Sequence, residues 1–177
     1  MNKAKKTEMI INCILGALSI ALAIFMFTYE YHALGAYAQT LPQEERMGFA
    51  TAAIILFILC YVGGGFGAFV LAFFLFGLTW KLHKARNDEQ IGEFIQTNKR
   101  INVKNRTLIV LIILKAVAVL FSVMFVLVET DAAHATVLSK TVYCVALAMY
   151  LGSLIFTLIN RKKIAESAME TKIENTK

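Results

Sequence analysis

Four long apolar stretches, separated by polar segments, dominate the pattern of hydrophobic and polar positions along the chain. They cover residues 9–29, 49–80, 107–128 and 141–160, and Lys115 is the one charged residue within them. A bilayer core about 30 Å thick is crossed by about 20 helical residues, so each stretch is long enough to span it. Inside lipid only helices and closed barrels satisfy the backbone, and these stretches lack the alternation of barrel strands. The pattern predicts an all-α integral membrane protein with four transmembrane helices in a compact bundle.

The second stretch is longer than one perpendicular span requires. Its 32 residues would form a helix about 48 Å long at about 1.5 Å per residue. Gly63, Gly64 and Gly65 lie near its middle, where glycine weakens a helix. Dividing the stretch at these glycines would leave two pieces of about 14 residues, which are too short to span. We therefore predict one long second helix that bends at Gly63–Gly65.

Composition supports the membrane prediction and excludes several classes of protein. The chain of 177 residues is 58% hydrophobic and 17% charged, whereas soluble domains are about 45–50% apolar and about 25% charged. Its three cysteines all lie within apolar stretches and form no CxxC motif. A disordered chain, a disulfide scaffold and a soluble Rossmann or TIM-type enzyme are excluded. We expect a single membrane domain over residues 1–177.

Positive charge is distributed unevenly over the polar segments. Of the 18 Lys and Arg residues, 15 lie before the first apolar stretch, in the loop of residues 81–106 or in the tail of residues 161–177. Cytoplasmic loops carry such an excess. We therefore predict a multi-pass protein of a bacterial plasma membrane, with both termini and the loop in the cytoplasm. This topology explains the basic segments, so no nucleic-acid partner is expected.

Lys115 is the most informative charged residue of the sequence. It lies nine residues after Arg106, about 13 Å further along a helix. Charges inside the membrane often mark a pathway or an anion-binding contact, but a lysine also snorkels to the headgroups. No Asp or Glu lies in the four stretches, so we favour snorkelling or a lipid-phosphate contact. The same absence argues against proton-coupled carriers and proton channels.

Several potential metal ligands follow the first and third stretches, on the side predicted to face outward. They are Glu30, His32, Glu129, Asp131 and His134. Imidazole and carboxylate groups suit a divalent metal, but spacing alone does not show that these groups converge. We expect ordinary polar loop residues, with no metal, no cofactor and no catalytic residue.

Small residues recur at helical spacing in the second and fourth stretches. Such stripes let helix backbones approach closely in lipid, either within the bundle or against a partner. The residues that form this expected packing or partner face are Gly63, Gly64, Gly67, Ala68, Ala72, Cys144, Ala148 and Gly152.

No family motif is recognised in the sequence. The four-span layout is common among small bacterial membrane proteins, including immunity proteins against pore-forming bacteriocins. The leading expectation is a non-enzymatic accessory or interaction subunit that binds another membrane protein, or itself, through its helix faces. The alternative is a small oligomeric channel or transporter working around Gly63–Gly67 or Lys115. A membrane enzyme ranks third, because no nucleophile–base set or metal motif is present.

Overall fold

The computed structural model describes residues 3–84, 97–132 and 134–166, and nearly all of them are helical. Four helical segments in these ranges are long and apolar enough to cross a membrane. They are Lys3–Thr40, Gly63–Lys81, Arg106–Thr130 and Val137–Ile164. The prediction of four such apolar helices is confirmed.

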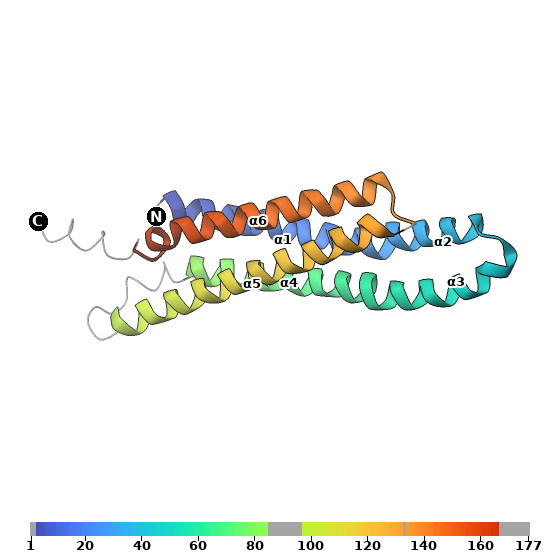
Figure 1. Cartoon of the computed structure of the whole chain (residues 1–177). Coiled ribbons are helices and arrows are strands. Elements are labelled where there is room, and N and C mark those ends of the chain that lie inside the picture. Colours follow the sequence, from blue (N-terminus) through green and yellow to red (C-terminus); the bar gives the residue numbers. More distant parts are fainter. Residues whose placement is uncertain (1–2, 85–96, 133, 167–177) are drawn as a thin grey trace, which may run out of the picture.

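The helical elements are longer than the apolar stretches that predicted them (Figure 1). In chain order they are α1 (Lys3–Phe25), the π-helical turn η1 (Met26–Glu30), α2 (Tyr31–Thr40), α3 (Gln43–Leu56), the π-helical turn η2 (Phe57–Val62), α4 (Gly63–Lys84), α5 (Thr97–Asp131) and α6 (Val137–Glu166). α1, η1 and α2 are continuous, and so are α3, η2 and α4. The expected loop of residues 81–106 is helical at both of its described ends, and residues 85–96 lie outside the described part.

The first connection is a helical hairpin. Only Leu41 and Pro42 separate α2 from α3, and the hairpin projects beyond the turn between α5 and α6 (Figure 1). Pro42 precedes the first residue of α3, where its missing N–H removes no helical hydrogen bond. Arg46 closes the turn, because its Nε donates to Leu41 O and its guanidinium donates to Gln39 O, each at 2.8 Å. Residues 30–48, which lie between the first two apolar stretches, therefore extend two of the helices.

The second long helix departs from regular α-helical geometry next to Gly63–Gly65, where the bend was predicted. The π-helical turn η2 covers Phe57–Val62 and ends where Gly63 begins α4. π-Turns are a recognised cause of irregularity within long helices. The deviation from α-geometry therefore lies just before Gly63–Gly65, in a segment whose composition carries no helix-breaking residue.

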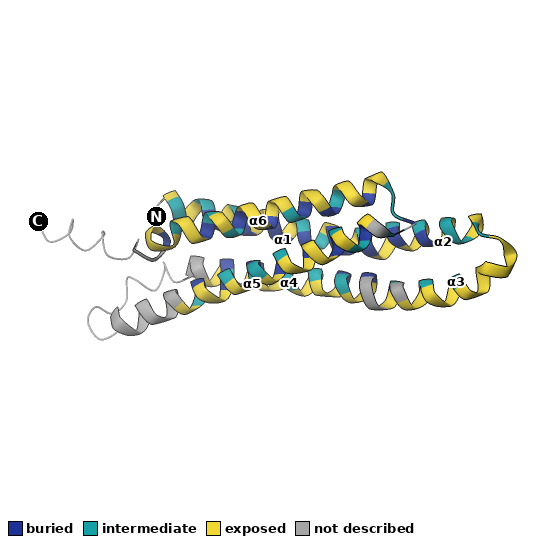
Figure 2. Ribbon diagram, in the orientation of Figure 1, coloured by how far each residue is buried: buried dark blue, intermediate teal, exposed yellow. Residues whose placement is uncertain are grey.

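The four long helices contact one another through faces that are not uniformly apolar. α1 packs chiefly against α4 and also against α6, and α5 packs against α6 and α4. Buried residues gather where the helices face one another, and exposed residues follow the outside (Figure 2). Large apolar side chains cover much of the outside, among them Phe66, Phe69 and Phe73 of α4. The interior, in contrast, contains Glu8, Lys115 and other polar side chains.

The small residues of the expected packing face lie in different environments. A Cβ atom on Gly64 would collide with the ring of Phe125, whereas a Cβ atom on Gly67 or Gly152 would meet no atom within 4 Å beyond the adjacent backbone of its own helix. Ala72 is buried and Ala68 is partly buried. The other five residues of that face are exposed: Gly63, Gly67, Cys144, Ala148 and Gly152. The α4 stripe thus makes one close internal contact, and the α6 stripe faces away from the interior.

Candidate functional site

The first group of buried ionisable residues joins α1, α5 and α6 toward the end of the molecule where the chain begins. Lys115 Nζ lies 2.5 Å from Glu8 Oε1 and donates a hydrogen bond to Thr157 Oγ1 at 2.7 Å. Thr157 Oγ1 is itself 2.9 Å from Glu8 Oε1. The exposed fractions are 1% for Lys115 and 0% for both Glu8 and Thr157. We call these three residues the inner cluster.

The inner cluster corrects the interpretation of Lys115. The prediction that this lysine snorkels because no carboxylate pairs with it is wrong. Glu8 immediately precedes the first apolar stretch, but α1 begins at Lys3, so Glu8 lies within the first apolar helix. The Lys115 ammonium group donates to the Glu8 carboxylate and to Thr157 inside the protein. It therefore does not extend to the lipid headgroups. The inference that the spans carry no carboxylate is wrong for the same reason.

A polar strip continues from the inner cluster between α1 and α6. Asn12 lies one turn after Glu8, and Ser153 lies one turn before Thr157; both are buried. Neither amide atom of Asn12, nor the hydroxyl of Ser153, has a hydrogen-bond partner within the described residues. Further along, Ser19 Oγ and Tyr150 Oη lie 2.5 Å apart. Buried polar groups normally have partners, so these open positions suit water or a polar solute.

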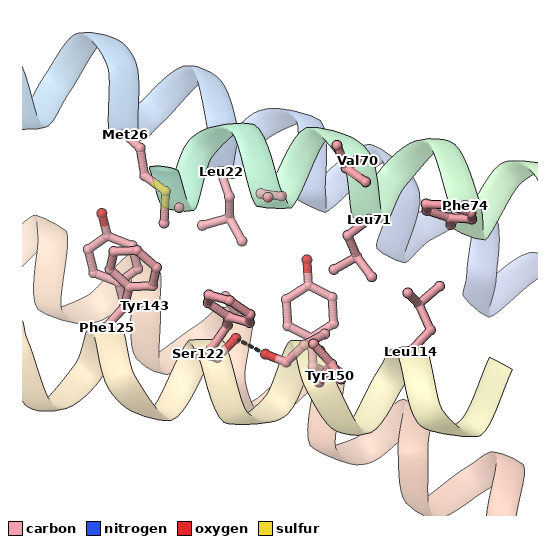
Figure 3. A pocket seen from close by; sticks show the side chains of 17 residues that line it. Leu22, Met26, Val70, Leu71, Phe74, Leu114, Ser122, Phe125, Tyr143 and Tyr150 are labelled. Atoms are coloured by element: carbon pink, nitrogen blue, oxygen red, sulfur yellow. Dashed lines mark hydrogen bonds between the residues drawn. The ribbon is translucent and has the colours of Figure 1, made fainter. Parts of the chain in front are cut away.

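A cavity of about 220 Å³ lies between the helices beyond Tyr150. Figure 3 shows Phe125 beside Tyr143 at one end of it, and Leu114 and Phe74 at the other. The lining is mostly apolar, and the hydroxyl of Ser122 already donates to a backbone carbonyl of its own helix. The cavity therefore separates the polar strip from a second group of ionisable residues.

That second group, the outer cluster, contains Glu30, Tyr61, Glu129, His134 and Tyr143. Tyr61 Oη donates to Glu129 Oε1 at 2.5 Å and lies 2.8 Å from His134 Nε2. Tyr143 Oη donates to Glu30 Oε1 at 3.3 Å. One oxygen of each carboxylate and one ring nitrogen of His134 all lie within 4.8 Å of one another. Five helical or loop segments thus contribute to a single polar site.

Three of the five potential metal ligands singled out in the sequence are brought together by this cluster: Glu30, Glu129 and His134. His32 is exposed and lies outside it. The side chain of Asp131 lies outside the described part of the chain. The interpretation of Glu30, Glu129 and His134 as ordinary polar loop residues is wrong, because the two carboxylates are 0% exposed and the imidazole is 8% exposed.

No protein-family model matches this sequence, and comparison with curated proteins and with solved structures finds no significant match. The chemistry of the buried clusters is therefore what indicates a function.

The charge of the outer cluster is unbalanced. Within the described residues, neither Glu30 nor Glu129 forms an ion pair with Lys or Arg. Burial lowers the pKa of His134 below its ordinary value of 6.5, an effect that the charge of Glu129 partly opposes. A neutral imidazole supplies no compensating charge at pH 7. Two carboxylates this close and this deeply buried require a proton or a bound cation to offset their repulsion.

The spacing of polar residues along the first helical segment indicates this polar interior, although the overall composition does not. In the first helical segment, Glu8, Asn12, Ser19 and Glu30 are separated by 4, 7 and 11 residues. All three separations are close to whole numbers of helical turns, so these side chains share one face. Counting only uninterrupted apolar residues places Glu8 and Glu30 outside the helix and hides this face.

Proposed function

We propose that this protein belongs to the channel or transporter class and moves a small cation along the interior of its helices. The observation that carries the proposal is the burial of Glu30 and Glu129 in one site where, among the described residues, no Lys or Arg forms an ion pair with either. Ionisable residues within membrane-spanning segments are costly, and they mark ion and substrate pathways. The polar strip between α1 and α6 and the inner cluster lie toward the other end of the molecule, and the mostly apolar cavity lies between them and the outer cluster.

The proposed arrangement is a single domain of four transmembrane helices, packed as a compact bundle in a bacterial plasma membrane. The N-terminal end of α1, the end of α4, the start of α5 and the end of α6 lie at one end of the molecule (Figure 1). Most Lys and Arg residues belong to the segments at this end, which favours a cytoplasmic location for it. The outer cluster then lies toward the opposite side of the membrane.

Cysteine labelling tests this orientation. In a variant without the three native cysteines, single cysteines replace exposed Lys3, Gln43, Lys140 or Arg161. A membrane-impermeant maleimide should label Gln43→Cys and Lys140→Cys in intact cells. Lys3→Cys and Arg161→Cys should react only after permeabilisation. Labelling of Arg161→Cys in intact cells would contradict the proposed topology.

Flux through liposomes tests the transport function. The purified protein is reconstituted, and proton, K⁺ and Zn²⁺ entry is followed with trapped fluorescent indicators. Glu129→Gln should lower the flux of the transported cation by about tenfold or more, because it removes one of the buried charges that would attract a cation. Glu44→Gln, the same change at an exposed carboxylate of α3, should leave flux unchanged. Equal flux in the two variants, or no flux of any of these cations, would refute the proposal.

A second candidate function is an accessory or interaction subunit of a membrane complex. The specific observation that favours it is the open backbone at Gly152 of α6, an exposed position where an added Cβ atom would meet no further atom within 4 Å. Small exposed residues permit a partner helix, from another membrane protein or a second copy, to approach closely. Under this alternative, Gly152→Leu releases a partner in mild detergent and Glu129→Gln does not. Under the transport proposal, Glu129→Gln lowers cation flux and Gly152→Leu does not.

A further inference from the structure

The outer cluster has the composition and geometry of a metal-binding site. Glu30 is the last residue of η1, Glu129 lies in the last turn of α5, and His134 belongs to the short connection before α6. The three ligand atoms, two carboxylate oxygens and one imidazole nitrogen, lie within 4.8 Å of one another. Residues about 100 positions apart in the sequence therefore present their metal-ligating atoms to the same small volume.

A second observation points independently to a ligand at this position. Glu30 Oε2 and Glu129 Oε2 are both fully buried, and neither has a hydrogen-bond partner within the described residues. A buried carboxylate oxygen without a partner is costly. Both orphaned oxygens belong to the carboxylates that form the cluster, so one cation between these groups would satisfy both of them.

We propose that Glu30, Glu129 and His134 bind one divalent metal ion of the Zn²⁺ type. Two carboxylates and a neutral imidazole give the site a charge that one divalent ion cancels, which suits a buried position. Mixed nitrogen and oxygen ligands are typical of Zn²⁺ and similar transition metals. Ca²⁺ takes six to eight oxygen ligands, and Mg²⁺ is held chiefly by oxygens and retained waters, so both fit this set of three less well.

Metal binding requires a modest closure of the ligands. Tetrahedral coordination at about 2.1 Å separates neighbouring ligand atoms by about 3.4 Å, compared with separations of up to 4.8 Å here. Rotation of the carboxylates, and of the His134 ring whose Nε2 lies 2.8 Å from Tyr61 Oη, would supply a movement of this size. Tyr61 donates to Glu129, and Tyr143 donates to Glu30. Hydrogen bonds of this kind orient metal ligands, so these tyrosines are positioning residues.

Metal binding at this site does not depend on the proposed transport function. Only the role of the bound ion rests on that function. If Zn²⁺ is the transported cation, the outer cluster is its first binding site on the path inward. If Zn²⁺ binds but does not cross, the site is a fixed metal centre and the transport proposal fails alone. If protons or K⁺ cross and no metal binds, the metal inference fails alone.

Calorimetric titration of the full-length protein in detergent tests the inference directly. After removal of bound metal with a chelator, Zn²⁺ should bind with one-to-one stoichiometry and raise the melting temperature, because it binds the folded state selectively. Glu129→Gln and His134→Ala should each weaken binding by about a hundredfold or more, since ligand loss exceeds the effect of losing an orienting contact. Mg²⁺ at the same concentration should give neither effect.

Matched controls use exposed residues of the same types. His32→Ala, two residues from Glu30, and Glu44→Gln on α3 should retain wild-type affinity. Because Glu129→Gln could also disturb folding, His134→Cys provides a second readout: it keeps a ligand and should add a thiolate-to-metal charge-transfer band when Co²⁺ is bound. Absence of one-to-one Zn²⁺ binding by the wild type would overturn the inference. Unchanged affinity in both ligand variants, or no such band in a folded His134→Cys protein, would also overturn it.

Discussion

Replacing Lys115 with leucine is expected to destabilise the protein by about 3–5 kcal/mol, the typical cost of breaking a buried ion pair from one side. The substitution leaves Glu8 fully buried and without the cation that lies 2.5 Å from its Oε1 atom. It also removes the donor to Thr157. Thermal and denaturant unfolding in detergent, followed by the helical circular dichroism signal, measures the change.

A double variant separates pairing from packing. In Glu8→Gln/Lys115→Met both charges are removed while the side-chain volumes stay similar, so most of the lost stability should return. Replacing a buried pair with uncharged residues is often neutral or stabilising by about 1–4 kcal/mol. Lys6→Leu, an exposed lysine of the same helix as Glu8, should have little effect. If Lys115→Leu unfolds like the wild type, the ammonium group reaches water or lipid headgroups, and the inner cluster does not form.

Replacing Gly64 with leucine is expected to cost about 1–3 kcal/mol or more through overpacking. Even the first added atom, Cβ, collides with the Phe125 ring. The ring is buried and stacked on Tyr143 with centroids 5.4 Å apart, so moving it away from the added atom disturbs this stacking. Gly64→Ala should therefore also be destabilising, since its single methyl already occupies the colliding position.

Gly67→Leu is the matched control for this effect. Gly67 lies three residues later on the same helix and lines the cavity, where an added Cβ atom would meet no further atom within 4 Å. Its replacement should be neutral or slightly stabilising, because glycine costs about 0.5–1 kcal/mol relative to alanine within a helix. The two leucine variants are compared by their melting temperatures in detergent. Equal melting temperatures would show that α4 does not approach Phe125 as closely as described.

The number of apolar helices was predictable because it depends on local composition. The energy of placing an apolar residue in lipid adds along the chain, and about 20 such residues make a span. The ends were less predictable. α1 extends back to Lys3 and α2 continues to Thr40, because a helix continues wherever its backbone hydrogen bonds are kept and does not stop at the first charged residue.

The composition of the outer cluster was partly visible in the sequence. Glu30, Glu129 and His134 were recognisable as potential metal ligands that follow two apolar stretches. Their convergence was not predictable, since Glu30 and Glu129 lie on different helices and His32 emerges beside Glu30 yet is exposed. A difference of two residues rotates a helical side chain by about 200°, which separates a buried ligand from an exposed one.

The sequence by itself determined that this chain forms four long apolar helices, because hydrophobicity and helix length are properties of neighbouring residues. Only the tertiary structure decided what the interior contains. Glu8 and Lys115 are 107 positions apart, and their ion pair depends on the rotation and the relative depth of α1 and α5. The same two quantities bring Glu30 to Glu129. Neither is set by the local pattern, because each arises from the simultaneous packing of all four helices.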